Sequence, residues 1–348
     1  MMQAKAYATL SATSPLQPIT INRRDPSSTD VVIKIIYCGI CHSDIHTAKS
    51  EWGPSFYPCV PGHEIVGCVV AVGKKVRRFK IGDWAGVGCL VDSCRKCTPC
   101  KSHEEQFCAD HPVFTYNSID LDGQGPTQGG YSSHIVVREN YVLKIKKGLP
   151  FERVAPLLCA GITTYSPLKR YGVRKGQRVG IVGLGGLGHM AVKIANAMGA
   201  QVTVFSTSPE KQLDAKKLGA KHFVVSTDPN QFIPLRGKLD LILDTVSAKH
   251  DFTPYLDSVK QNGTMVLLGA APDLNEVSAF SLISGHKKLT GSLIGGIQET
   301  QEMLDYCARK KIFADIELIP ASRINEAYER TLAGQVKYRF VIDIKTLS

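Results

Sequence analysis

The sequence predicts an α/β protein with two domains: a doubly wound parallel sheet covered by helices, and a second, mostly β domain. Three observations support this prediction. The chain has 348 residues, which is too long for one small core. From about Gln177, strand and helix patterns alternate, as in a parallel sheet covered on both faces. Before about Lys147, β-branched runs are broken by Gly and Pro, which indicates short strands joined by turns and loops.

The first and last parts of the chain contribute the mostly β domain. Strands are expected at 31–37, 65–72 and 134–137. The last fifty or so residues return to mixed elements, with a helix near 298–310 and a strand near 338–344. We expect this C-terminal segment to pack back on the first domain, which would make that domain discontinuous.

The middle of the chain carries the alternating elements. A helix is expected over 189–198, closed by Gly199, and another begins at Ser208-Pro209 and ends at Gly219. The expected strands are 178–182, 201–205, 222–225, 239–243 and 264–268. We therefore place the doubly wound domain at 154–296 and the mostly β domain at 1–153 with 297–348.

Composition and charge narrow the possible functions. The net charge is +11, but the basic residues occur as scattered pairs such as Lys74-Lys75, without the basic run that follows a phosphate backbone. A zinc-binding, nucleic-acid-associated protein is therefore disfavoured. The N-terminus lacks a signal-peptide pattern and no run approaches membrane-spanning length, so we expect a cytoplasmic protein. Eleven cysteines in a reducing compartment indicate metal binding or catalysis, although Cys38, Cys59, Cys68 and Cys307 resemble small buried hydrophobes.

A glycine-rich turn indicates the dinucleotide site. The motif G-x-G-x-x-G is weak alone, but here it follows a predicted strand directly and opens a helix. The glycines permit a sharp turn and let the backbone approach a pyrophosphate at the helix N-terminus. This Rossmann fingerprint comprises Gly183, Leu184, Gly185, Gly186, Leu187 and Gly188.

The end of the second strand of this domain bears on the choice between NAD and NADP. An acidic residue there would bind the ribose 2′-hydroxyl and repel a 2′-phosphate. The expected acidic position is Ser206, and Thr207, Ser208 and Lys211 add hydroxyls and positive charge. An ordinary helix cap at Ser208 is compatible with this interpretation. NADP(H) is the predicted cofactor.

Two sets of potential ligands predict two zinc ions per chain. Cys94, Cys97, Cys100 and Cys108 form C-x2-C-x2-C-x7-C, which can close a structural zinc tetrahedron; an iron–sulfur cluster is the chemical competitor.

The second set is scattered: Cys41, His63, Glu64 and Cys159. Each alone is more simply explained by packing. Together they supply two thiolates, one imidazole and one carboxylate, and two Cys with one His is a known catalytic zinc arrangement with an open position. Such a zinc would polarise a carbonyl oxygen or lower the pKa of a bound alcohol.

Longer motifs resemble those of the zinc-containing medium-chain alcohol dehydrogenases, of the cinnamyl-alcohol-dehydrogenase type with its bacterial aldehyde reductases. The resemblance covers essentially the whole chain. It includes the segments 37–44 (YCGICHSD), 57–64 (YPCVPGHE), 155–165 (APLLCAGITTY), 291–296 (GSLIGG) and 338–343 (YRFVID). It implies a GroES-like fold for the mostly β domain, and a homodimer.

The resemblance also implies residue roles. Cys41, His63 and Cys159 would hold the catalytic zinc, with Glu64 as an alternate ligand. Ser43 would take the alcohol proton and pass it towards His46, although an ordinary surface histidine is the alternative for His46. The implied cofactor contacts are His42, Thr163, Thr245, Gly269, Ser292, Ile294 and Arg339.

The predicted reaction is transfer of a hydride from NADPH to an aldehyde, reversibly, with zinc stabilising the developing charge. Apolar or aromatic aldehydes such as cinnamaldehyde or benzaldehyde are favoured, because the plausible pocket walls are Trp52, Tyr57, Cys89, Leu90 and Ile294. The alternative within this class is a dehydrogenase that mainly oxidises alcohols or polyols. A non-catalytic NADPH-binding relative is disfavoured because no zinc ligand is missing.

Overall fold

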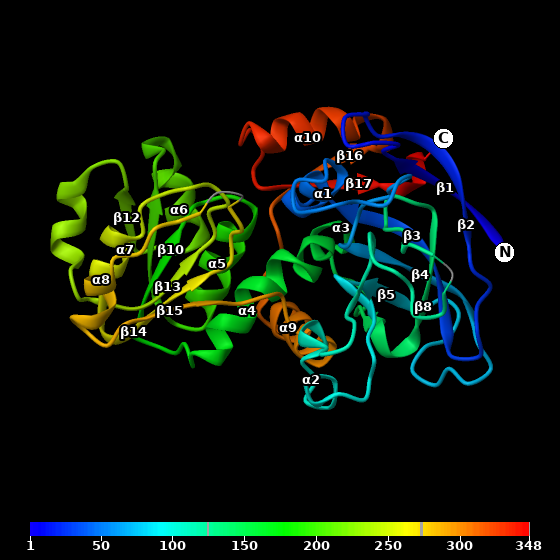
Figure 1. The fold of residues 1–348 in the computed structure, drawn as a ribbon, viewed down its shortest axis with the longest axis horizontal. Helices are drawn as coiled ribbons and strands as arrows, with labels where there is room; N and C mark the ends of the chain where they lie inside the picture. The colour runs from blue at the N-terminus through cyan, green and yellow to red at the C-terminus, as the bar shows by residue number, and fades with distance from the viewer. Residues whose placement is uncertain (124, 272–273, 348) are drawn as a thin grey trace. The chain divides into compact units, whose positions relative to one another are not determined.

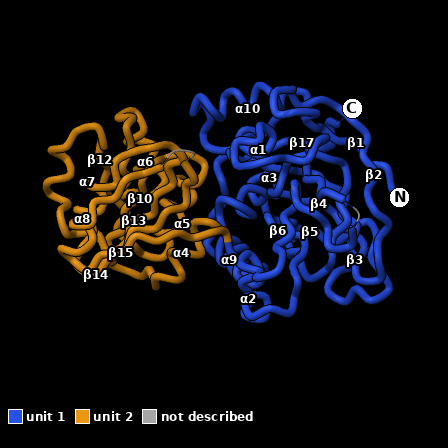
Figure 2. Tube along the Cα trace, in the orientation of Figure 1, with its two compact units in different colours: residues 1–162, 295–348 blue, residues 163–294 orange. Residues whose placement is uncertain are grey.

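The computed structural model describes residues 1–123, 125–271 and 274–347 (Figure 1). The chain forms two compact units, Met1–Ile162 with Gly295–Ser348, and Thr163–Ile294 (Figure 2). None of the helices in the described residues has the length and apolar character needed to cross a membrane.

The unit Thr163–Ile294 is built on a six-stranded parallel sheet with the order β12-β11-β10-β13-β14-β15. In chain order, the strands run outward from β10 to β12. The next strand, β13, then pairs with the other side of β10. This reversal is the switch point at which doubly wound sheets bind dinucleotides. The strands are β10 (Arg178–Val182), β11 (Gln201–Ser206), β12 (His222–Val225), β13 (Leu239–Asp244), β14 (Val259–Leu267) and β15 (Lys288–Gly291).

Helices accompany this sheet, and buried aromatic rings form part of its core. The rings of Phe205 and Phe232 stack at 5.4 Å, and Tyr255 packs edge-on against both. The helices of this unit are α5 (Gly186–Ala197), α6 (Gln212–Leu218), α7 (Thr253–Ser258) and α8 (Ala279–Ile283), while α4 (Ala160–Arg170) begins in the other unit.

The predicted strands of this unit are confirmed, with ends that differ by one residue in β11 and β13, and larger differences occur at the starts of β14 and α5. Strand β14 begins at Val259, well before the expected start at Thr264, because its polar first half faces solvent and lacks the apolar pattern used to find it. Helix α5 begins at Gly186 rather than His189, because the last glycines of the motif already have helical geometry. The helix expected from Ser208 starts as a 3₁₀ turn, Pro209–Lys211, in which the Ser208 side chain makes no cap.

The other unit contains a seven-stranded sheet with the order β16-β17-β3-β4-β5-β9, and β8 pairs with β3. Its strands are β3 (Asp30–Gly39), β4 (Ile65–Val72), β5 (Trp84–Val87), β8 (His134–Arg138), β9 (Leu143–Lys144), β16 (Ile316–Pro320) and β17 (Arg339–Asp343). Two further pairs are β1 (Met2–Ala8) with β2 (Gln17–Arg23), and β6 (Leu90–Asp92) with β7 (Val113–Phe114). The helices are α1 (His42–Ala48), α2 (Thr98–Lys101), α3 (Phe151–Val154), α9 (Ile297–Lys310) and α10 (Ile324–Leu332).

Strand pairing in this sheet brings distant segments to one edge. Near the end of β3, Cys38 pairs with Ile65 at the start of β4, and β17 pairs antiparallel with the same end of β3. The segment before β4 is packed tightly: Gly62 has a φ of 106°, and a Cβ there would lie 2.7 Å from the Tyr131 ring. The residues just after β3 and just before β4 are therefore neighbours.

The expectation of buried cysteines is confirmed for Cys38, Cys59 and Cys307, which are 0%, 2% and 0% exposed. It is wrong for Cys68, which is half-buried, because the strand β4 is only partly covered at that position.

Candidate metal centres and cofactor site

The scattered ligand set comes together in one buried cluster. One donor atom from each of Cys41, His63, Glu64 and Cys159 lies within 4.8 Å of the others, and all four residues are buried. The sulfurs of Cys41 and Cys159 are 3.9 Å apart. Nε2 of His63 is buried without a hydrogen-bond partner in the described part of the chain. A buried ring nitrogen of this kind is normally satisfied, so the cluster fits a metal ion bound by Nε2 and the thiolates.

Asp44 was not predicted as a functional residue, and the structure places it under this cluster. Its fully buried carboxylate accepts hydrogen bonds from the backbone nitrogens of Cys41, at 2.8 Å, and Gly62, at 3.0 Å. The hydroxyl of Tyr131 donates to it at 3.0 Å. Asp44 thus links the two segments that carry Cys41 and His63. The available signal was its position three residues after Cys41, the residue that caps α1.

Glu64 forms an ion pair with Arg339, and both side chains are almost fully buried. Burial raises the pKa of the Glu64 carboxyl, while the guanidinium of Arg339 acts in the opposite direction. Arg339 is the first residue of β17, so the pairing of β17 with β3 delivers it to this position. A contact of Arg339 with a cofactor phosphate stays a prediction.

The two residues expected to carry protons lie on α1. The Oγ of Ser43 is 3.6 Å from the sulfur of Cys41. Nδ1 of His46 hydrogen-bonds to the carboxylate of Glu51, and the His46 ring stacks on Trp52 with centroids 4.6 Å apart. His46 is half-buried, and these two contacts hold its ring; its part in proton transfer stays a prediction. Glu51 was not identified from the sequence, since nothing in its spacing distinguishes it from other surface carboxylates.

Cys89, expected to be core or a pocket wall, lies beside the same cluster. Its thiol donates to the carbonyl of Leu158 at 3.9 Å, and the neighbouring Cys159 thiol is the main reason that the pKa of Cys89 is lowered. Leu90, the next predicted wall residue, is 2% exposed.

The second cluster unites the sulfurs of Cys94, Cys97, Cys100 and Cys108, again within 4.8 Å of one another. The backbone nitrogen of Cys97 donates to the sulfur of Cys94, and that of Cys94 donates to the sulfur of Cys108, both at 3.4 Å. Such bonds stabilise thiolates. Four closely spaced sulfurs with these donors fit a closed structural zinc site, hereafter the four-cysteine site.

The glycine motif forms the turn between β10 and α5. Gly183 has a φ of 87°, which a side chain would strain. A Cβ on Gly188 would lie 2.1 Å from the carbonyl oxygen of Gly183, so only glycine lets α5 begin this close to the strand. The Oγ1 of Thr245, a predicted cofactor contact, donates to the carbonyl of Val182 at 2.7 Å. Gly269 is equally constrained, since a Cβ there would lie 2.2 Å from the Val246 carbonyl.

The end of β11 presents the residues expected near a 2′-phosphate. Ser206 is buried, and its Oγ accepts a hydrogen bond from the backbone nitrogen of Ser208 at 3.2 Å. Thr207 is exposed, while Ser208 and Lys211 are half-buried. Ser206 therefore shapes the turn, and the other three residues offer accessible polar groups.

The remaining residues predicted to contact the cofactor differ in exposure and in backbone conformation. Thr163 is buried, whereas His42 is exposed on α1. Ser292 follows β15 and donates its backbone nitrogen to the Leu267 carbonyl at 3.1 Å, and Ile294 has a φ of 36°.

Comparisons with known proteins agree with this geometry. Residues 27–147 match the model of the alcohol dehydrogenase GroES-like domain, and residues 186–309 match that of the zinc-binding dehydrogenases. The chain is 55% identical to NADP-dependent alcohol dehydrogenase C of Mycobacterium bovis, covering 100% of both chains. It is 52% identical to aldehyde reductase YahK of Escherichia coli, again covering 100% of both. The solved structure of CAD from Helicobacter pylori complexed with NADP(H) superposes with a TM-score of 0.94 at 48% identity, covering 100% of this chain and 99% of that one.

Proposed function

The chain belongs to the zinc-containing medium-chain alcohol dehydrogenase family, cinnamyl-alcohol-dehydrogenase type, and on this premise we propose that it is an NADPH-dependent aldehyde reductase. The observation that carries the proposal is the buried cluster of Cys41, His63, Glu64 and Cys159, in which the His63 ring nitrogen Nε2 has no partner among the described residues. Full-length relatives named as NADP-dependent alcohol dehydrogenase and aldehyde reductase support the same reaction class.

We propose that each residue of the cluster has a distinct part. Cys41, His63 and Cys159 would hold zinc, which when bound polarises the carbonyl oxygen of the substrate. Asp44 would fix the His63 ring so that Nε2 faces the metal. NADPH would supply the hydride.

The proton needed by the product alcohol would come from Ser43, whose hydroxyl lies beside the sulfur of Cys41. His46 would restore that proton from solvent. The carboxylate of Glu51 accepts from Nδ1 of His46 and thereby leaves Nε2 as the nitrogen that exchanges a proton. His46 and Glu51 are thus proposed as the outer end of a proton path.

We propose that Thr207, Ser208 and Lys211 select NADPH. They follow β11, and no carboxylate occupies position 206 to repel a 2′-phosphate. The unit Thr163–Ile294 is then the dinucleotide-binding domain, and the unit with the two clusters is the catalytic domain.

The preferred substrates are proposed to be apolar or aromatic aldehydes. A second candidate is a dehydrogenase working mainly in the oxidative direction on alcohols or polyols. It is supported by 50% identity to a protein named as a probable mannitol dehydrogenase of Fragaria ananassa.

One steady-state experiment separates these candidates. Aldehydes of increasing apolar size would be assayed with NADPH and NADH, and mannitol and simple alcohols with NADP and NAD. Highest kcat/KM for an aromatic aldehyde with NADPH would support the proposal. Highest kcat/KM for a polyol with NAD would contradict it.

We also propose a cytoplasmic homodimer. Helix α8 exposes 76% of Phe280 and 65% of Ile283, and Leu274, earlier in the chain, is 89% exposed. Exposed apolar side chains of this size favour association with a second copy. Sedimentation of the parent and of Phe280→Asp would test this, with a monomeric parent contradicting it.

A further inference from the structure

Ser93, which no ligand motif includes, lies against one sulfur of the four-cysteine site. It is fully buried, and its Oγ is 3.0 Å from the sulfur of Cys100. The hydroxyl of Tyr141 lies 2.6 Å from the same Oγ, and the backbone nitrogen of Arg95 donates to it at 3.3 Å. Three polar groups therefore converge on one serine hydroxyl.

The direction of these bonds follows from counting protons. A hydroxyl has one proton to donate and two lone pairs that accept. The Arg95 nitrogen can only donate, so it uses one lone pair of Ser93. A metal-bound cysteine is a thiolate and can only accept. The Ser93 hydroxyl therefore donates its hydrogen bond to the charged sulfur of Cys100. The hydroxyl of Tyr141 donates to the remaining lone pair of the Ser93 oxygen.

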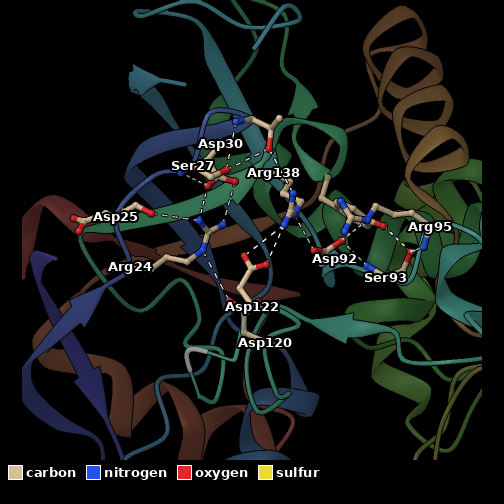
Figure 3. A network of polar contacts seen from close by, with 12 residues as sticks. Arg24, Asp25, Ser27, Asp30, Asp92, Ser93, Arg95, Asp120, Asp122 and Arg138 are labelled. Carbon is tan, nitrogen blue, oxygen red and sulfur yellow. Dashed lines mark hydrogen bonds and ion pairs between the residues drawn. The ribbon is translucent and has the colours of Figure 1, made fainter. Parts of the chain in front are cut away.

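The main chain of Ser93 is fixed to the sheet by a second set of contacts (Figure 3). Its backbone nitrogen donates to Oδ1 of Asp92 at 2.8 Å, and Oδ2 of Asp92 accepts from Nε of Arg138 at 2.9 Å. Arg138, at the end of β8, also reaches Asp122 at 3.1 Å. Through Asp92 and Arg138, Ser93 thus joins the loop that carries the four cysteines to strand β8, which pairs with β3.

A cavity of about 470 Å³ borders this arrangement, lined among others by Ser93, Arg95, Cys100, His103 and Tyr141. Cys100 is therefore the one cysteine of the four-cysteine site among the described residues that line this cavity. Water or a chelator entering this cavity would reach the bond between the metal and the Cys100 sulfur.

We propose that Ser93 is a positioning residue for the metal of the four-cysteine site: its hydroxyl, oriented by Tyr141, donates to the Cys100 thiolate and retains the metal on its cavity side. The hydrogen bond stabilises the Cys100 thiolate and slows its dissociation from the metal. This goes beyond the reductase reaction, because it concerns retention of the structural metal.

The test is the rate at which zinc leaves the purified holoenzyme to an excess of 4-(2-pyridylazo)resorcinol. The phase belonging to the four-cysteine site is the one lost in Cys100→Ala. Ser93→Ala should accelerate this phase about 10–100-fold, the usual effect of removing a partner of a metal ligand. Tyr141→Phe should accelerate it less, and Ser93→Thr, which keeps the hydroxyl, should stay close to the parent.

Matched controls separate metal retention from general loosening. Ser258 is another fully buried serine, with a hydroxyl that donates to the Pro254 carbonyl at 2.9 Å. Tyr255 is another buried tyrosine, packed edge-on against the Phe205 ring with centroids 5.3 Å apart. Ser258→Ala and Tyr255→Phe should lower the melting temperature without altering zinc release from the four-cysteine site.

The absorption spectrum of the Co²⁺-substituted protein provides an independent measurement. With Co²⁺ in the four-cysteine site, the sulfur-to-metal charge-transfer band should shift in Ser93→Ala and return in Ser93→Thr. Parent-like release and an unshifted band in Ser93→Ala would overturn the proposal, as would equal acceleration in Ser258→Ala. If Ser93→Ala does not fold, Tyr141→Phe decides, and a parent-like release rate there would overturn it.

Discussion

Oδ1 of Asp44 lies 3.4 Å from Nδ1 of His63, while Nε2 on the other side of the same ring has no partner in the described structure. The hydroxyl of Tyr116 is 3.2 Å from the same Nδ1. One nitrogen of the ring is thus held by polar groups of the protein, which leaves the opposite nitrogen directed at the metal cluster.

Replacement of Asp44 by Asn should weaken zinc binding at the mixed site of Cys41, His63 and Cys159 about 10–100-fold, because a neutral amide orients the His63 ring less strongly. Tyr116→Phe removes the other contact to Nδ1 and should have a smaller effect. Competition with a chelator of known affinity measures both variants. Parent-like affinity in Asp44→Asn would show that the carboxylate does not support His63.

Ser43→Ala should lower kcat about 10²–10⁴-fold, as expected when a positioned acid–base group is removed. The affinity for NADPH should stay near that of the parent, because Ser43 lies at the metal cluster rather than in the dinucleotide fold. Ser43→Thr retains the hydroxyl and should recover most of the turnover. Stopped-flow assays and NADPH fluorescence titration give the two quantities; normal turnover in Ser43→Ala would remove this residue from the proton path.

Lys211→Ala should weaken NADPH binding about 10–100-fold, because one charge-assisted contact to the 2′-phosphate contributes about 1.5–3 kcal/mol. NADH binding should be almost unchanged. Lys216→Ala, an equal change of charge on the exposed side of α6, is the control. A parallel loss for both cofactors in Lys211→Ala would contradict the phosphate contact.

His250 should make a pH-dependent contribution to stability. Burial alone would lower the pKa of His250, but its ion pair with the Asp244 carboxylate, at 3.2 Å, and its hydrogen bond to the Ala248 carbonyl outweigh this and raise it. A raised pKa in the folded state favours folding fully below the ordinary histidine pKa of about 6.5, and this gain is lost as pH rises through the folded-state pKa.

The unfolding free energy of the parent should therefore exceed that of His250→Gln by the largest margin near about pH 5.5, below that ordinary value, and by less at higher pH. Urea unfolding curves across this range measure the margin, with His222→Gln at the exposed start of β12 as control. A margin that grows with pH would contradict the Asp244 pairing.

The sequence predicted local features well where one physical constraint dominates. Gly183 and Gly188 stand where the backbone tolerates no side chain, and four clustered cysteines have few chemical uses. Both patterns can therefore be recognised from the sequence alone. Asp44 and Glu51 were missed because their partners, His63 and His46, are reached through pairing of β3 with β4 or through a turn. Ser93 was missed for a different reason: a serine belongs to no metal-ligand spacing that the sequence could reveal.

The two metal clusters differ in the length of chain they close. Cys94 and Cys108 are separated by 14 positions, whereas Cys41 and Cys159 are separated by 118. Loop-closure entropy grows with the logarithm of length, so joining the distant pair costs about 2 kcal/mol more than joining the near pair. During synthesis the loop of the four-cysteine site can close on its metal while later segments are still being made. The mixed site has to wait for Cys159 and for the pairing of β3 with β4, so a metal bound there reports that these distant segments of the chain have come together.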